Sequence, residues 1–466
     1  MHREKREKYV VPGFYSRMLA LAIPIALQNM LSSCAGLVDT AMVARLGNAA
    51  TSAVGISGKW IMLLQMLSFG ICSGGSVLIS QFWGAGEHKN VRRAYSLGMY
   101  LCIAAAALYT VVLACFPYEL MCLFTNEEPV RQAGVEYLSV VCWGMVPWAF
   151  ANIANMARRC VEDVHIPLAI SAAAVVTNTF FNWCLIYGKL GMPALGLRGA
   201  ALATVISHCV QAVLVVVIGL RQGHFTLSGL RAIGSVDRPF LQKYLHIAMP
   251  VICNETLWCV GFNLYAVIYA RQGSHNYAAY TLYSSIEQLV FVFFVGACNA
   301  CSIMIGKSIG QGLLRDARAI ARKMLGVFVA MGAVLGAALL VIRWPIIRLM
   351  GVESAYTAQM TADILAFYCC WCPLRQLNYV LVVGILRAGG DTRVSALLDV
   401  GVTLLWGVPV AFVLAYVLKA PFLVLVCGSF VAEDILKLPL CLWRFRSGKW
   451  LHSLTSHPVE TAEEIV

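Results

Sequence analysis

Twelve stretches of mainly apolar residues run through this chain, and they limit its possible fold more than any other feature. A helix needs about 20 such residues to cross the hydrocarbon core of a bilayer. Because lipid offers no hydrogen-bonding partners, a spanning segment must satisfy its own backbone groups, which an α-helix does. We therefore predict an all-α, polytopic membrane protein with twelve transmembrane helices. The predicted spans lie near residues 16–44, 51–82, 94–115, 132–157, 166–188, 196–219, 244–270, 277–307, 319–342, 356–386, 394–418 and 421–443.

The composition supports a membrane protein over a soluble one. Of the 466 residues, 60% are hydrophobic and only 12% are charged, whereas soluble domains keep about a quarter of their residues charged. The 18 cysteines lie inside apolar runs, where a free cysteine packs as a small apolar side chain. We expect neither a disulfide framework nor a metal site at the two CxxC spacings, Cys298/Cys301 and Cys369/Cys372.

The basic residues predict the orientation of the chain in the membrane. The net charge is +12, and most lysines and arginines fall in alternate loops, as they do on the cytoplasmic side of membrane proteins. Examples are residues 3–8, Lys89–Arg93, Arg315–Lys323 and Arg444–Lys449. With twelve spans, both termini are then cytoplasmic. The positive charge thus reflects topology, and we predict no nucleic-acid partner.

The two halves of the sequence repeat each other at an offset of 226 residues, which pairs Pro24 with Pro250 and Gly47 with Gly273. An even number of helices per half inserts both halves the same way up, so the repeat predicts two six-helix bundles related by a pseudo-twofold axis along the membrane normal. Transporters of this type bind substrate at the repeat interface. The predicted parts are an N-lobe (1–220), a cytoplasmic linker (221–243), a C-lobe (244–451) and a cytoplasmic tail (452–466).

An acid stands deep in the first predicted span. Inserting Asp39 at mid-membrane costs roughly 2.5–3.5 kcal/mol, and its partner in the repeat is Tyr265, so the fold itself does not demand a carboxylate there. We predict that Asp39 binds a coupling ion, Na⁺ or H⁺. A purely structural hydrogen bond to a neighbouring helix is the alternative.

Two further acids are candidates in the second half. Glu255 follows Pro250 in the seventh span, and its repeat partner is Asn29. It could bind the coupling ion or neutralise a cationic substrate, or else reach the membrane interface. Glu287 in the eighth span is a weaker candidate. The remaining acids lie nearer predicted helix ends, where structural roles are expected; these are Asp363, Asp399, Glu433 and Asp434.

Uncharged polar residues on the predicted helices could complete these sites. Asn178 and Asn182 are four residues apart and so share one helix face, and with Thr204 they would line a polar pocket beside Asp39. Ordinary interhelical hydrogen bonds are the alternative for each. We predict a substrate cleft lined by Asn29, Asn152, Asn155, Trp258, Tyr265 and Glu287.

Five segments, taken in order, resemble the multidrug and toxic compound extrusion (MATE) family. The similarity extends over nearly the whole chain, and no single segment is specific by itself. The segments are Pro24–Asn29 (PIALQN), Asp39–Gly47 (DTAMVARLG), Ile79–Gly86 (ISQFWGAG), Leu195–Thr204 (LGLRGAALAT) and Leu386–Thr392 (LRAGGDT).

The resemblance implies an antiporter of the inner (cytoplasmic) membrane, with two six-helix lobes around a V-shaped central cleft. A two-lobed transporter can work as a monomer, and we expect a monomer here. It implies export of small organic cations and amphiphiles against inward flow of Na⁺ or H⁺, with no cofactor. In the family, the acid that corresponds to Asp39 belongs to the N-lobe cation site. One branch has a further Asp in the fifth helix, where this chain has Asn182. Glu255 resembles a seventh-helix acid that another branch uses for Na⁺ coupling.

Alternating access between two lobes is the expected mechanism, and four other functions can be compared with it. A flippase for lipid-linked oligosaccharides would need several intramembrane cations to hold a pyrophosphate, and Lys59 and Arg375 are the candidates. An exporter of an anionic or neutral metabolite is a further alternative. An enzyme is not expected, because His208 and the serines form no nucleophile or metal motif, and no loop resembles a channel filter.

Overall fold

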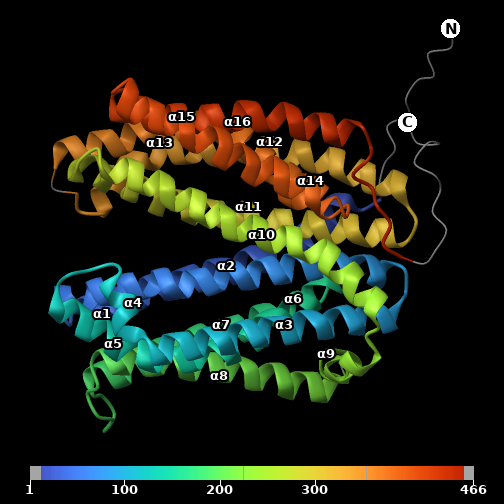
Figure 1. The fold of residues 1–466 in the computed structure, drawn as a ribbon, viewed down its shortest axis with the longest axis horizontal. Coiled ribbons are helices and arrows are strands. Elements are labelled where there is room, and N and C mark those ends of the chain that lie inside the picture. The colour runs from blue at the N-terminus through green and yellow to red at the C-terminus, as the bar shows by residue number, and fades with distance from the viewer. Residues whose placement is uncertain (1–11, 224, 353, 456–466) are drawn as a thin grey trace. The chain divides into compact units, whose positions relative to one another are not determined.

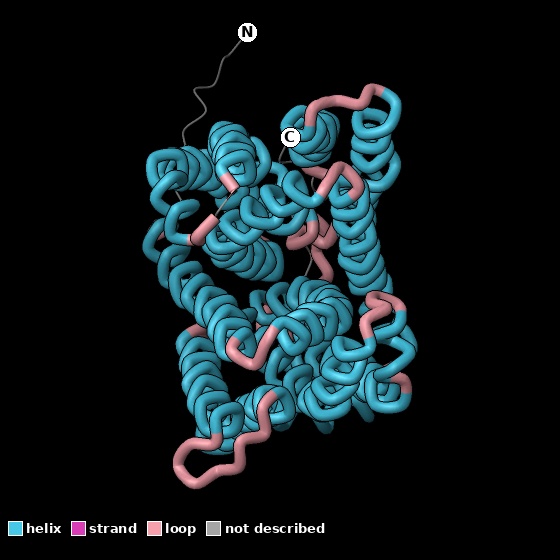
Figure 2. The backbone as a smooth tube through the Cα atoms, turned by 90° about the vertical axis from the view of Figure 1, so that its left-hand side faces the viewer, coloured by secondary structure: helices cyan, strands magenta, loops and turns pink. Residues whose placement is uncertain are grey.

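The computed structural model describes residues 12–223, 225–352 and 354–455. The N-terminal basic residues 3–8 and the tail beyond Thr455 lie outside this part of the chain. Figure 2 shows the described chain as helices joined by short loops, and no strand longer than the isolated bridge between Gly390 and Leu451 occurs in these residues. The all-α prediction is therefore confirmed.

Each predicted span corresponds to a helix or to consecutive helical segments (Figure 1). The N-terminal half contains α1 (Phe14–Ala44), α2 (Asn48–Gly84), α3 (His88–Cys115), α4 (Pro117–Cys122), α5 (Glu128–Val141), η1 (Cys142–Gly144), α6 (Met145–Cys160), α7 (His165–Tyr187) and α8 (Leu197–Gln222). Two short segments, α9 (Phe225–Ser228) and η2 (Gly229–Ser235), occupy the predicted linker. The C-terminal half contains α10 (Arg238–Ala270), α11 (Ser274–Gly310), α12 (Leu314–Leu349), α13 (Ala355–Tyr379), η3 (Val380–Leu386), α14 (Thr392–Ala396), η4 (Leu397–Gly401), η5 (Thr403–Gly407), α15 (Val408–Phe412), η6 (Val413–Val417) and α16 (Phe422–Arg446).

Within the described residues, eleven helices are long and apolar enough to cross a membrane. The twelfth predicted span is α16, which has the necessary length. It carries Glu433, Asp434 and Lys437 near its middle, which sets it apart from the other spans. Three ionisable residues in one transmembrane helix are costly and mark a candidate functional region.

The repeat is visible in the helix boundaries. Helices α2 and α11 each have 37 residues, and each begins and ends 226 positions from the other. The turn before each helix contains a glycine with nearly the same positive φ, 110° at Gly47 and 111° at Gly273. An L-residue with a side chain rarely adopts such an angle, so the shared glycines are explained by the turn that both halves need.

The chain divides into two compact units. The N-terminal unit comprises Pro24–Ile79 and Glu87–Cys259, and the C-terminal unit comprises Val260 onwards with Ser80–Gly86 and α1 up to Ile23. Helices α1, α2 and α10 thus contribute to both. The lobe boundaries expected at residues 220 and 244 stay a prediction.

Close backbone contact holds helices together inside each unit. In the C-terminal unit, α12 packs along α13, and Gly332 and Gly336 face the backbone of Pro373 and Cys369. In the N-terminal unit, Gly70 and Gly74 of α2 meet the α10 backbone in the same way. Small residues at such crossings are typical of membrane helices, which gain van der Waals contact by approaching closely.

The second half departs from regular α-helix in four places. The segments η3, η4, η5 and η6 are π-helical. Short π-helical insertions occur often at functional sites, because they widen the turn and re-aim the side chains. Two of these segments supply residues to the charged network described below.

Candidate functional site

Asp39 lies where three helices of the N-terminal unit meet. The amide nitrogen Nδ2 of Asn182 on α7 donates a hydrogen bond to Asp39 Oδ1 on α1, and it also donates to Oδ1 of Asn178 at 3.2 Å. Asn178 in turn donates to Oγ1 of Thr204 on α8 at 3.5 Å. The structure therefore joins the four residues predicted for the first ion site into one connected group, here called the Asp39 cluster.

The local sequence explains this geometry. Asn178 and Asn182 lie on one face of α7 because residues four apart stack on a helix, and both are at least 95% buried. A hydrogen bond from Tyr187 Oη to the backbone oxygen of Met42, at 2.9 Å, ties the end of α7 to α1. Tyr137 on α5 also interacts with Thr204. The sequence analysis missed Tyr137, because a tyrosine in an apolar span gives no signal of its own.

Within the described residues, no lysine or arginine forms an ion pair with Asp39, and Asn182 Oδ1 has no hydrogen-bond partner. A buried carboxylate needs a proton, a metal ion or a basic group to be stable. The Asp39 cluster offers a carboxylate together with amide and hydroxyl oxygens, the ligand type that hard cations prefer. It can therefore hold either a proton on Asp39 or a small cation among these oxygens.

Glu255 is also in the N-terminal unit, on α10, and is 8% exposed. Its Oε1 accepts a hydrogen bond from Nδ2 of the adjacent Asn254 at 3.4 Å. The burial is what an ion-binding acid requires, and it argues against a side chain that merely reaches the interface.

Four residues predicted for the substrate cleft also belong to this unit. Asn155 is buried and Asn29 is half-buried, and each has a buried polar atom without a hydrogen-bond partner among the described residues, Oδ1 and Nδ2 respectively. Asn152 donates to the Cys72 sulfur at 3.6 Å, and Trp258 is half-buried. The two unsatisfied amides fit a ligand-facing role, since buried polar groups are normally paired.

The other two predicted cleft residues, Tyr265 and Glu287, lie in the C-terminal unit and belong to a separate polar network. The Glu287 carboxylate is 3.6 Å from the Arg375 guanidinium. Arg375 also lies 3.9 Å from Asp434 and 4.6 Å above the ring of Phe430. Asp434 accepts two further hydrogen bonds of 2.9 Å, from the Trp371 indole and the Asn378 amide.

Lys437 is the centre of the second part of this network. Its Nζ lies 2.8 Å from Asp399 Oδ1 and 2.8 Å from Glu433 Oε1. Glu433 also accepts hydrogen bonds from Thr403 Oγ1 at 2.7 Å and from Tyr265 Oη at 3.4 Å. A run of aromatic rings in tilted or edge-to-face contact continues from Tyr265 through tyrosines 269, 280, 283 and 368.

The sequence analysis gave Asp399, Glu433 and Asp434 structural roles and did not single out Lys437. The structure places all four inside the C-terminal unit, where they pair with one another or with Arg375. A usable signal was present, because α16 combines two acids with a lysine one turn later inside an otherwise apolar span. That i, i+4 spacing predicts an ion pair.

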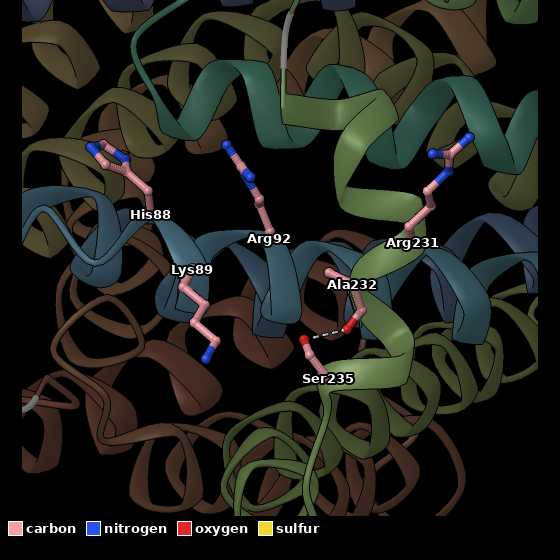
Figure 3. A pocket seen from close by; sticks show the side chains of 6 residues that line it. All are labelled: His88, Lys89, Arg92, Arg231, Ala232 and Ser235. Atoms are coloured by element: carbon pink, nitrogen blue, oxygen red, sulfur yellow. Dashed lines mark hydrogen bonds between the residues drawn. The ribbon is translucent and has the colours of Figure 1, made fainter.

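A pocket of about 380 Å³ lies beside the first turns of α3 (Figure 3). In Figure 3, His88, Lys89 and Arg92 project from α3, and Arg231 projects from η2. Its lining contains no carboxylate, so it is not suited to a cation. It belongs instead to the basic regions that the sequence analysis assigned to the cytoplasmic side.

Comparisons with known proteins agree with one another. A family model described as MatE matches residues 24–184 and 250–413. The probable multidrug resistance protein NorM of Thermotoga maritima is 24% identical over 451 residues, which cover 95% of this chain and 94% of that relative.

Solved structures share the fold. The bent form of the Vibrio cholerae MATE transporter VcmN superposes with a TM-score of 0.83 at 17% identity, covering 94% of this chain and 99% of that one. A MOP superfamily transporter from Pyrococcus furiosus, whose binding pocket is described as having reverse polarity, gives 0.83 at 17% identity, covering 95% of this chain and 99% of that one. At such identities the likeness establishes the fold.

Proposed function

This chain belongs to the MatE family and is thus a multi-pass membrane transporter for multidrug efflux rather than an enzyme, and we propose that it is an antiporter exporting cationic or amphiphilic small molecules in exchange for Na⁺ or H⁺. We place it in the cytoplasmic membrane as a monomer. Both termini and the basic loops, including the one that contains Arg92 and the linker with Arg231, then face the cytoplasm.

The Asp39 cluster is the observation that carries this proposal. It is a half-buried carboxylate within transmembrane helices, surrounded by neutral polar groups and without a basic partner in the described part of the chain. A bound positive charge offsets the cost of taking this carboxylate out of water, so occupancy of the site changes the electrostatic energy of the helices around it. This makes it suited to link ion binding to a conformational change.

The energetic requirement is modest. One elementary charge that moves through a potential of 100 mV supplies about 2.3 kcal/mol, which corresponds to roughly a fifty-fold concentration ratio. Thermodynamic reciprocity requires that the ion and the exported compound weaken each other's binding. Ion uptake at Asp39 would thus promote release of the compound to the outside and reset the transporter.

The intramembrane cations fit the flippase alternative poorly. Arg375 and Lys437 are each paired with two carboxylates, and Lys59 is exposed near the start of α2. To bind a pyrophosphate group, basic side chains must be available for hydrogen bonds and ion pairs with its oxygens. Here the arginine and the lysine are already neutralised by carboxylates of this chain.

The test is efflux of ethidium from drug-sensitive bacterial cells that express the chain, with the Na⁺ and H⁺ gradients varied separately. We expect export that follows one of the two gradients, and loss of that dependence in Asp39→Asn at unchanged membrane expression. Asp316→Asn is the matched control, because the same change falls in the first turn of α12.

Normal, gradient-dependent export by Asp39→Asn would remove Asp39 from the mechanism. If the wild-type chain exports no organic cation although it is well expressed in the membrane, the proposal of a cationic substrate is wrong. An anionic or neutral metabolite would then be the substrate to test, followed by lipid-linked oligosaccharides.

A further inference from the structure

The ammonium group of Lys437 sits among oxygens in the manner of a bound cation. Nζ has Asp399 Oδ1 and Glu433 Oε1 at 2.8 Å each, and Thr403 Oγ1 at 3.5 Å. The residue is only 6% exposed. A lysine ammonium is a compact point charge on a flexible stem, so its environment can be compared directly with that of a free monovalent cation.

The oxygens come from separate segments of the chain. Asp399 belongs to η4 and Thr403 to η5, the π-helical segments of the eleventh span, while Glu433 belongs to α16. Thr403 Oγ1 lies 2.7 Å from Glu433 Oε1 and 2.9 Å from the backbone oxygen of Asp399, and its single hydroxyl proton can be donated to either of them. Thr403 thus links the eleventh span to Glu433 of α16 independently of the lysine, while the Asp399 carboxylate is paired with Lys437.

The charge count also indicates a cation site. Two carboxylates face one ammonium at Lys437, and two carboxylates, those of Glu287 and Asp434, face the one guanidinium of Arg375. A structural role would need only one acid for each base, and replacing such a buried pair by apolar residues often leaves the stability equal or higher. A second acid at each base keeps the surroundings attractive to positive charge.

We propose that Asp399, Glu433 and Thr403 form a monovalent-cation site that this chain fills with its own Lys437 ammonium. The tethered ammonium then excludes an inorganic cation from the C-terminal unit and leaves the Asp39 cluster as the site where the coupling ion exchanges. The statement about coupling rests on the function proposed above, but the occupancy of the site by Lys437 does not.

Removal of the Lys437 side chain should leave an empty cation site. When Lys437 is shortened to alanine, two carboxylates and a hydroxyl remain around a space the size of the lost side chain. That space should accept Na⁺ or a small primary ammonium such as methylammonium, and it should reject choline, which is too large to be enclosed by these oxygens. Binding to the folded state raises its stability in a saturable manner.

The experiment measures thermal unfolding of the purified full chain in detergent, by tryptophan fluorescence. Asp39→Asn serves as the parent, so that the first ion site does not respond. NaCl and methylammonium chloride are titrated against choline chloride at constant ionic strength. We expect no cation-specific change in the parent, and in Asp39→Asn/Lys437→Ala a lower Tm that either cation raises by about 2 °C or more.

Adding Glu433→Gln to the double variant should abolish the response, since it removes one of the two carboxylates. If Lys437→Ala does not give monodisperse protein, Lys437→Ser replaces it, because serine also leaves the space of the long side chain open. Lys189→Ala, in the loop after α7, controls for the substitution itself.

Two outcomes would overturn the proposal. One is a monodisperse Lys437 variant whose Tm is no more sensitive to cations than that of the parent. The other is a cation response that is already present in the parent and lost with Glu433→Gln, because the site would then bind a cation beside Lys437. Neither outcome depends on transport, so failure of this proposal can be distinguished from failure of the proposed antiport.

Discussion

The contact between α12 and α13 predicts that one substitution, glycine to alanine, destabilises the protein at two positions of α12 and has the opposite effect at a third. A Cβ atom added at Gly336 would lie 2.5 Å from the backbone oxygen of Cys369, and one added at Gly332 would lie 2.7 Å from Cα of Pro373. At Gly326, also on α12, an added Cβ would meet no atom within 4 Å. Alanine should therefore destabilise the protein at the first two positions and stabilise it at the third.

The magnitude follows from the distances. Real Cβ atoms essentially never come closer than 3.0 Å to such atoms, so at Gly336 the helices must separate by at least 0.5 Å. Because the obstructing atom belongs to the backbone, no side-chain rotation relieves the contact. A radial gap of about 0.5–1 Å forfeits roughly a quarter to a half of the dispersion energy of each contact, and overpacking of this kind costs about 1–3 kcal/mol.

The expected effect at Gly326 has the other sign. A glycine in the interior of an exposed helix costs about 0.5–1 kcal/mol relative to alanine, since it loses more backbone freedom on folding. Alanine there gains this amount and meets no steric obstacle.

The assay is thermal unfolding of the purified protein in detergent, with the three single variants measured side by side. Gly336→Ala and Gly332→Ala should lower the Tm by several degrees, while Gly326→Ala should leave it unchanged or raise it slightly. Equal effects at Gly336 and Gly326 would refute the reasoning, because glycine's backbone entropy would then outweigh the interhelical contact at both positions.

Three other predictions concern the polar sites and one helix end. Asn182→Leu should leave the folded protein intact but reduce gradient-driven efflux at least ten-fold, because Asp39 loses its amide neighbour; normal efflux in whole cells would contradict this. Arg375→Met should destabilise the protein by about 3–5 kcal/mol, since it leaves the carboxylates of Glu287 and Asp434 without their cationic partner. Adding Glu287→Gln should recover part of the lost Tm, and no recovery would mean that Arg375 and Glu287 do not interact. Ser354→Ala should lower the stability by about 0.5–2 kcal/mol, because the serine caps the start of α13 by accepting a backbone hydrogen bond at 3.3 Å; an unchanged urea unfolding midpoint would show that the cap contributes nothing.

The spans were predictable because hydropathy is a local property of the chain. The expected span 51–82 is α2 (Asn48–Gly84), and the expected span 277–307 is α11 (Ser274–Gly310). Both helices extend a few residues beyond the apolar stretch, since the polar residues at their ends, near the membrane–water interface, continue the helical hydrogen bonding. The repeat was predictable for a similar reason, because its glycines recur wherever both halves need the same turn.

The Asp39 cluster was predictable only in part. The spacing of Asn178 and Asn182 fixes a common helix face, and an acid in an apolar span is a functional candidate by itself. The sequence does not show that this face of α7 meets Asp39, which is 143 residues away from Asn182. That contact depends on how α1, α7 and α8 pack.

The sequence alone therefore determined the membrane class, the number of spans, the internal repeat and the cost of each intramembrane charge, because these follow from residue type and near neighbours. Only the tertiary structure decided which charges are compensated. Lys437 and Asp399 are 38 positions apart and lie in different spans, yet their charged atoms are 2.8 Å apart, whereas Asp39 has no basic partner in the described residues. Electrostatic energy depends on distance in space, and that distance is set by helix packing rather than by position along the chain.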